Sequence, residues 1–153
     1  MTEERKQDYT RRITQASRGM IVVLTFEMAL DYLTDVRQAK TEQERNAAIR
    51  RVKRCVSALH DALNYEYELS FVLMRLYNYV NECMDKALFR RDDAWLEEPE
   101  KIMSRLHSAF EEAVKSDDSE AVMQNAEAVY TGLTYGPEGM NTSFDNAGRG
   151  FRA

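Results

Sequence analysis

The chain has 153 residues, 44% of them hydrophobic and 31% charged, a composition that excludes a disordered or membrane-spanning protein. Its longest uncharged apolar run, residues 19–26, is far too short to cross a bilayer. The net charge of −5 is uneven, with +4 over residues 1–54 and −9 over residues 55–153, which is too little positive charge for a nucleic-acid surface and suits a protein partner.

The first two segments differ sharply in polarity. Residues 1–16 are mostly charged and polar, and we predict that they form an N-terminal arm. A helix is predicted from an N-cap at Ser17 to about Gln38. This helix is apolar nearly all round, whereas a surface helix has one apolar face. It is therefore either the buried centre of a bundle or a helix with one side covered by something else.

The stretch from Glu42 to Arg90 contains no Gly and no Pro. A single helix of this length would extend for about 74 Å, whereas a domain of this size has a radius of gyration of about 15 Å. We therefore predict two helices with a break at residues 64–68. Asn64 is the predicted C-cap of the first, and acidic residues suit the first turn of the second.

Two further turns are predicted at residues 90–93 and 115–118, where basic residues precede acidic ones. Pro99 places the start of the fourth helix near Glu98, or marks a kink if that helix starts at Asp93. A short fifth helix is predicted to run to Tyr130 and to be closed by Gly132.

These elements predict an all-α protein, an antiparallel four-helix bundle with a short fifth helix. We assign residues 1–16 to the N-terminal arm and residues 17–131 to the helical bundle. Residues 132–153, which hold five of the six glycines, are assigned to a flexible C-terminal tail.

No catalytic or metal-binding motif is recognisable. His60 and His107 each follow a Ser three positions earlier, not the Glu that di-iron bundles require. Cys55 and Cys83 are 28 residues apart at apolar helical positions, which indicates buried free thiols in a reduced cytosolic protein. We expect no enzyme activity, no metal and no cofactor.

The first and third helices carry more apolar residues than one core face needs. Tyr77 and Tyr79, for example, project about 200° apart on a helix, so only one of them can face the core. Either the arm and the fifth helix cover the remaining apolar faces, or a groove accepts an apolar helix from a partner. Both alternatives hold together if the arm is a cover that a partner can displace.

Several segments, in the right order and spacing, resemble the flagellar export chaperone FliS family. The resemblance covers about residues 9–136, although Arg18-Gly19 replaces the usual Pro and Glu66-Tyr67-Glu68 stands where many relatives have glycines. The matching residues are Tyr9, Ile13, Thr14, Ala16-Ser17, Phe26-Glu27-Met28-Ala29-Leu30, Leu76-Tyr77-Asn78-Tyr79-Val80, Ala87, Asp92, Ile102, Leu106, Phe110 and Val129-Tyr130-Thr131-Gly132-Leu133-Thr134-Tyr135-Gly136.

The resemblance implies a cytoplasmic chaperone that binds the disordered C-terminal region of flagellin, blocks premature polymerisation and supports delivery to the type III export apparatus. It also implies an arm that covers part of the binding surface and moves on binding. Further expectations are export-gate components as partners and a homodimer of the empty protein, without nucleic acid or membrane insertion. The predicted partner-binding residues are Tyr9 and Ile13 in the arm and Val22, Phe26, Leu73, Tyr77 and Val80 in the groove.

Two other interpretations remain open at this point. The chain could be a helical adaptor or regulator that binds another amphipathic segment, which a pull-down with flagellin against an unrelated amphipathic peptide would distinguish. The second interpretation is a bundle enzyme or metal carrier, which stoichiometric iron or zinc in the purified protein would favour.

Overall fold

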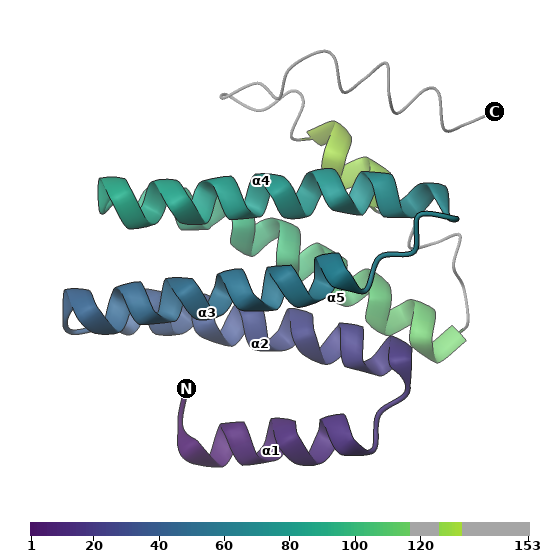
Figure 1. The fold of residues 1–153 in the computed structure, drawn as a ribbon, viewed down its shortest axis with the longest axis horizontal. Helices are drawn as coiled ribbons and strands as arrows, with labels where there is room; N and C mark the ends of the chain where they lie inside the picture. The colour runs from purple at the N-terminus through teal and green to yellow at the C-terminus, as the bar shows by residue number, and fades with distance from the viewer. Residues whose placement is uncertain (117–125, 133–153) are drawn as a thin grey trace.

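The computed structural model describes residues 1–116 and 126–132, and the regular structure of these residues is entirely helical, as predicted (Figure 1). The elements in chain order are α1 (Glu3–Thr14), α2 (Arg18–Gln38), α3 (Glu42–Asp61), α4 (Glu68–Arg90), the 3₁₀ helix η1 (Asp93–Leu96), α5 (Glu97–Ser116) and a final helical segment over residues 126–132.

The start of α2 agrees with the predicted N-cap, and α3 begins in an equally local way. The Ser17 hydroxyl accepts a hydrogen bond of 3.2 Å from the Met20 N–H, and α2 begins at the next residue, Arg18. Thr41 and Glu44 form a reciprocal capping box at the start of α3. Both helices therefore begin where local hydrogen bonds satisfy the N–H groups of the first turn.

The predicted break between α3 and α4 is confirmed, but its C-cap is different. Ala62, not Asn64, caps α3. Asn64 instead stabilises the turn: its side-chain oxygen accepts from the Glu66 N–H at 3.0 Å, and its carbonyl accepts from the Ser70 hydroxyl. An Asn side chain that bonds two residues ahead favours a turn over a helix end, which explains the shift.

The structure also shows how α4 ends and where Pro99 lies in α5. Arg91 follows α4 in the left-handed region, with φ 53°, and ends the helix. Pro99 lies in the first turn of α5, where the missing N–H would have no helical partner, so it causes no kink.

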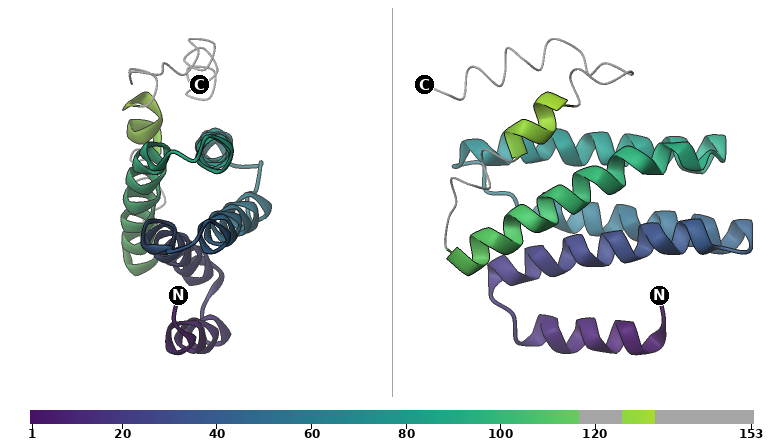
Figure 2. Two further views of the ribbon diagram at one scale, coloured as in Figure 1. Left: turned by 90° about the vertical axis from the view of Figure 1, so that its left-hand side faces the viewer. Right: turned by 180° about the vertical axis from the view of Figure 1, so that it is seen from behind.

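The helices α2, α3, α4 and α5 surround a common core (Figure 2). Successive helices α2, α3 and α4 run in alternating directions, and α5 crosses behind them at an angle (Figures 1 and 2). α2 packs against both α3 and α5, whereas α4 closes the bundle against α3 and α5. The segment 126–132 adds Ala126, Val129 and Tyr130 to the core.

The C-terminal predictions are only partly within the described residues. Gly132, expected to close the fifth helix, is itself helical. The rest of the predicted tail, residues 133–153, lies outside the described part of the chain. Cys55 and Cys83 are both buried free thiols, as predicted.

The N-terminal arm is a helix, which the sequence analysis did not anticipate. The Thr2 hydroxyl caps α1, its first turn carries Glu3 and Glu4, and its last turn carries basic residues. These charges suit the helix dipole. α1 lies along the outer side of α2, away from the core (Figures 1 and 2).

Candidate partner-binding surface

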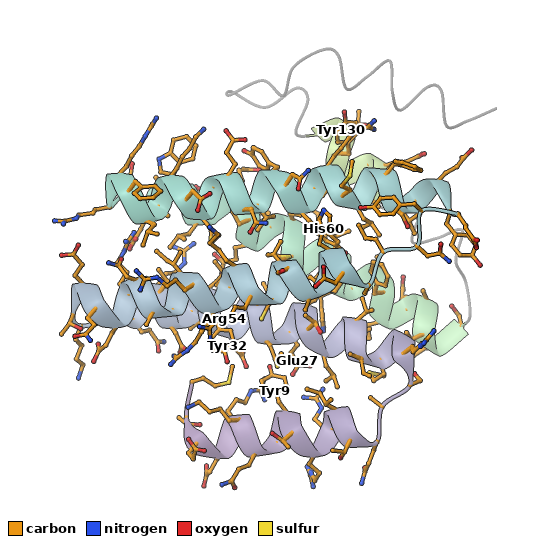
Figure 3. The ribbon with its side chains drawn as sticks, viewed as in Figure 1. Tyr9, Glu27, Tyr32, Arg54, His60 and Tyr130 are labelled. Atoms are coloured by element: carbon orange, nitrogen blue, oxygen red, sulfur yellow. The ribbon has the colours of Figure 1, made fainter. Side chains whose placement is uncertain are left out.

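α1 is attached to α2 by a group of charged and aromatic residues that we call the α1–α2 cluster. Figure 3 shows Tyr9 on the side of α1 that faces α2, and Glu27 on the side of α2 that faces α1. The cluster consists of Arg5, Tyr9 and Arg12 on α1 and of Glu27, Asp31 and Asp35 on α2.

Tyr9 lies at the centre of this cluster and is only 2% exposed. Its hydroxyl donates a hydrogen bond of 2.6 Å to Asp31 and accepts one of 3.2 Å from Arg5. The guanidinium groups of Arg5 and Arg12 lie 4.9 Å and 5.7 Å from the centre of its ring. Burial, together with the hydrogen bond to Asp31, raises the pKa of the Tyr9 phenol, so Tyr9 remains a donor at neutral pH.

The two arginines bind the α2 carboxylates directly. Arg12 makes a bidentate pair with Glu27, with N–O distances of 2.9 Å and 2.8 Å. Arg5 donates to Asp31 at 2.8 Å and to Glu27 at 3.0 Å. The hydrogen bond to Asp31 raises the pKa of Arg5, and the one to Glu27 raises that of Arg12.

The third carboxylate of α2, Asp35, pairs with the amino group of Met1, which precedes α1. The Arg5 and Arg12 side chains remain 41% and 36% exposed, so water screens their pairs and each contributes modestly. α1 is thus held by many weak polar contacts around one buried ring.

The predicted partner-binding residues fall into two separate sets. In the outer set, Tyr9 is buried under α1 but lies outside the core, and Ile13 is half-buried on the same helix. In the inner set, Val22 is half-buried against the core, and the remaining four residues belong to the core itself. These four are Phe26, Leu73, Tyr77 and Val80.

The core brings part of the inner set together. The rings of Phe26 and Tyr77 are 6.3 Å apart, and the ring of Phe110 lies 5.3 Å from that of Phe26. Tyr77 is 1% exposed and Phe26 is fully buried, so a partner can reach them only if the bundle opens. The outer set needs only the release of α1.

Sequence reasoning missed the charged half of the α1–α2 cluster. It followed the surplus of apolar residues and did not weigh Glu27, Asp31 and Asp35, which recur every four residues on one side of α2. The matching signal in the arm was the pair Arg5 and Arg12, two helical turns apart.

Other kinds of site have little support in the described residues. No group of three or more His, Cys, Asp or Glu in residues 1–116 and 126–132 is placed to hold a metal ion. None of the helices described is long and apolar enough to span a membrane. Burial raises the pKa of the Cys55 thiol to about 11, which is the opposite of what a reactive thiol needs.

Comparison with known proteins gives one result. A family model described as "Flagellar protein FliS" matches residues 1–117. The matched region includes all the helices from α1 to α5 and therefore the whole α1–α2 cluster. No curated protein matches the chain.

Proposed function

Because the chain belongs to the FliS flagellar protein family of non-enzymatic export chaperones, we propose that it binds the C-terminal region of flagellin in the cytosol. Binding would hide the polymerisation-prone segment of flagellin and deliver it to the flagellar type III export apparatus. The observation that carries this proposal is α1 itself, a separate helix attached to the outside of the bundle mainly by polar contacts.

A chaperone for a disordered apolar segment must satisfy two opposing demands. It needs apolar and aromatic surface to bind the client, and it must cover that surface when empty. α1 is held by screened ion pairs around the buried ring of Tyr9, so it detaches at low cost, and its release makes that ring and the side of α2 beneath it available to the client. Moderate, reversible affinity is then expected, since ordering the client costs several kcal/mol.

The two sets of residues suggest an order of events. Release of α1 carries Tyr9 and Ile13 away from the bundle and exposes the side of α2 that Tyr9 covers. Val22 is half-buried against the core and is partly accessible before α1 leaves. The deeper residues Phe26, Leu73, Tyr77 and Val80 take part only if the client separates the helices around them. Ile21, 39% exposed at the start of α2, extends the apolar surface at this end of the helix.

The test is a titration with the C-terminal segment of flagellin from the same cell, with a random amphipathic helix as control. Deletion of residues 1–15 is expected to change flagellin affinity while the circular dichroism of the bundle persists. Equal affinity with and without α1 would show that α1 is not a cover, and equal binding of both peptides would favour a general helical adaptor.

A matched pair of substitutions tests the same point in the full-length chain. Arg12→Ala removes the bidentate pair with Glu27, whereas the ion pair of its neighbour Arg11 within the described residues is with Asp8 of α1 itself. We expect Arg12→Ala to alter flagellin affinity and Arg11→Ala to leave it close to that of the wild type. The same response to both substitutions would mean that release of α1 does not control access.

A further inference from the structure

We infer that the α2 face under α1 recognises a basic and aromatic helical segment, so that the part of the client that replaces α1 carries two basic residues seven positions apart with a tyrosine between them. This inference rests on the proposed function and adds the chemistry of the partner.

The acidic side chains of α2 define one half of this recognition. Glu27, Asp31 and Asp35 are spaced four residues apart and therefore lie on one side of the helix, about one turn from each other. Like charges at this spacing repel each other, so a partner that supplies positive charge stabilises this face. Their side chains are only 22%, 32% and 23% exposed beneath α1.

α1 provides the matching half within this chain. Among the described residues, all hydrogen-bonding partners of the Glu27 and Asp31 carboxylates lie in α1. Arg5 and Arg12 are seven residues apart, two turns of a helix, and Tyr9 lies between them. The pattern Arg-x₃-Tyr-x₂-Arg thus describes a helix that satisfies this face.

The α2 carboxylates need new partners whenever another helix replaces α1. Water hydrates all three carboxylates after α1 has left, and any incoming helix removes that water again. An apolar segment without cations would leave Glu27 and Asp31 covered and unpaired, which is strongly unfavourable. A segment with Arg or Lys at both ends and a Tyr hydroxyl between them restores the contacts that α1 made with these two carboxylates. The face therefore selects its occupant by charge as well as by shape.

The first experiment uses full-length protein with Arg5→Ala and Arg12→Ala, which loosens α1 but keeps the α2 face. The ligand is a labelled helical peptide with the sequence of residues 1–16, followed by fluorescence anisotropy. A second peptide carries Glu at positions 5 and 12. The control peptide carries Glu at positions 6 and 11, so its net charge is the same; among the described residues, Lys6 and Arg11 pair with Glu3 and Asp8 of α1 itself.

We expect the change at positions 5 and 12 to weaken binding by about tenfold or more, and the change at positions 6 and 11 by about threefold at most. In protein that carries Glu27→Lys and Asp31→Lys, the preference should reverse in favour of the peptide with Glu at positions 5 and 12. Equal binding of the two Glu-substituted peptides, or no reversal, would overturn the inference.

The second experiment uses the flagellin C-terminal segment as the ligand of the same loosened protein. Glu27→Gln with Asp31→Asn should weaken binding by about tenfold, because the partner's cations lose their carboxylates. Glu82→Gln with Glu98→Gln removes two exposed carboxylates elsewhere and should leave binding unchanged. Circular dichroism confirms that each variant is folded.

The outcomes separate the two proposals. If flagellin binds the protein with Glu27→Gln and Asp31→Asn as well as it binds the protein with Glu82→Gln and Glu98→Gln, the chaperone function stands and the recognition of a basic and aromatic pattern is wrong. If flagellin binds neither protein, the proposed function fails, and the peptide comparison alone decides whether the α2 face reads charge.

Discussion

Tyr9 of α1 and Asp31 of α2 are joined by a hydrogen bond of 2.6 Å, although they are 22 residues apart in the chain. The same carboxylate accepts a hydrogen bond from Arg5, and the guanidinium groups of Arg5 and Arg12 both lie over the Tyr9 ring. This contact fixes the register of α1 on α2. The strength of the attachment can therefore be measured through Tyr9.

Tyr9→Phe keeps the buried ring but removes the hydroxyl that donates to Asp31. Hydrogen bonds to charged groups contribute about 1.5–3 kcal/mol. Losing this one should raise the equilibrium constant for the opening of α1 by the factor that this free energy corresponds to. Hydrogen exchange of the amides in α1 measures this opening, while the exchange of α4 should not change. Tyr67→Phe is the matched control, because Tyr67 is 67% exposed. Equal exchange in both variants would contradict this role of Tyr9.

The attachment of α1 should weaken at alkaline pH. The pKa of Tyr9 is raised when α1 is docked, chiefly by burial and then by the Asp31 hydrogen bond, with Glu27 raising it and Arg5 lowering it. In released α1 the phenol has its ordinary pKa of about 10. The contribution of Tyr9 to docking is therefore constant below about pH 10 and is lost as the pH rises towards the higher pKa of the docked state.

A fluorescence donor and acceptor placed on α1 and α3 would follow this pH dependence. Subtracting the curve of Tyr9→Phe isolates the contribution of Tyr9 from that of the other tyrosines. A difference curve that is flat above pH 10 would contradict the assigned cause.

Phe26→Ala should strongly destabilise the bundle. Phe26 is fully buried, and its ring lies against those of Tyr77 and Phe110. Removing a buried Phe side chain costs about 3–5 kcal/mol, because a cavity remains. Urea denaturation measures the loss, and Ile21→Ala on the same helix, where the side chain is 39% exposed, should cost about 1 kcal/mol or less. A comparable loss for both would mean that Phe26 is not a core residue in solution.

Gly19 and Val114 should show energetic coupling. A Cβ at position 19 would lie 3.0 Å from Cγ2 of Val114, too close without a small shift of that half-buried side chain. Gly→Ala in a helix gains up to about 1 kcal/mol, so the crowding should cancel most of that gain in Gly19→Ala. In a Val114→Ala background the same substitution should stabilise the protein relative to that background. Additive free energies in this double-mutant cycle would contradict the close contact.

Cys55 should react slowly with thiol reagents. Burial raises its pKa to about 11, so its thiolate fraction at pH 8 is on the order of 100-fold below that of an ordinary cysteine. A Cys83→Ala chain leaves Cys55 as the only thiol, and its reaction with a disulfide reagent can be followed by absorbance. The rate should rise to the ordinary value in urea. Full reactivity in the native state would contradict the burial of Cys55.

Sequence reasoning predicted the helix boundaries well where their causes are local. The Ser17 cap depends on a hydrogen bond to a residue three positions away, and the break between α3 and α4 overlaps the predicted residues 64–68. The exception is the C-cap of α3, which is Ala62 and not Asn64. Asn favours both helix ends and turns, and Asn64 bonds the Glu66 N–H in the turn. The four-helix bundle could be predicted from helix lengths and apolar stripes.

The sequence by itself thus determined that the chain is helical, where α2 begins and roughly where α3 gives way to α4, and it left open whether α2 is the buried centre of the bundle or carries a cover on one side. Only the tertiary structure decided that this cover is the helix α1, that Arg5, Tyr9 and Arg12 meet Glu27 and Asp31, and that Phe26 and Tyr77 belong to the core. The physical reason is distance along the chain. Caps and apolar stripes depend on neighbours within a turn or two, whereas the contacts of α1 with α2 join residues 15 to 26 positions apart.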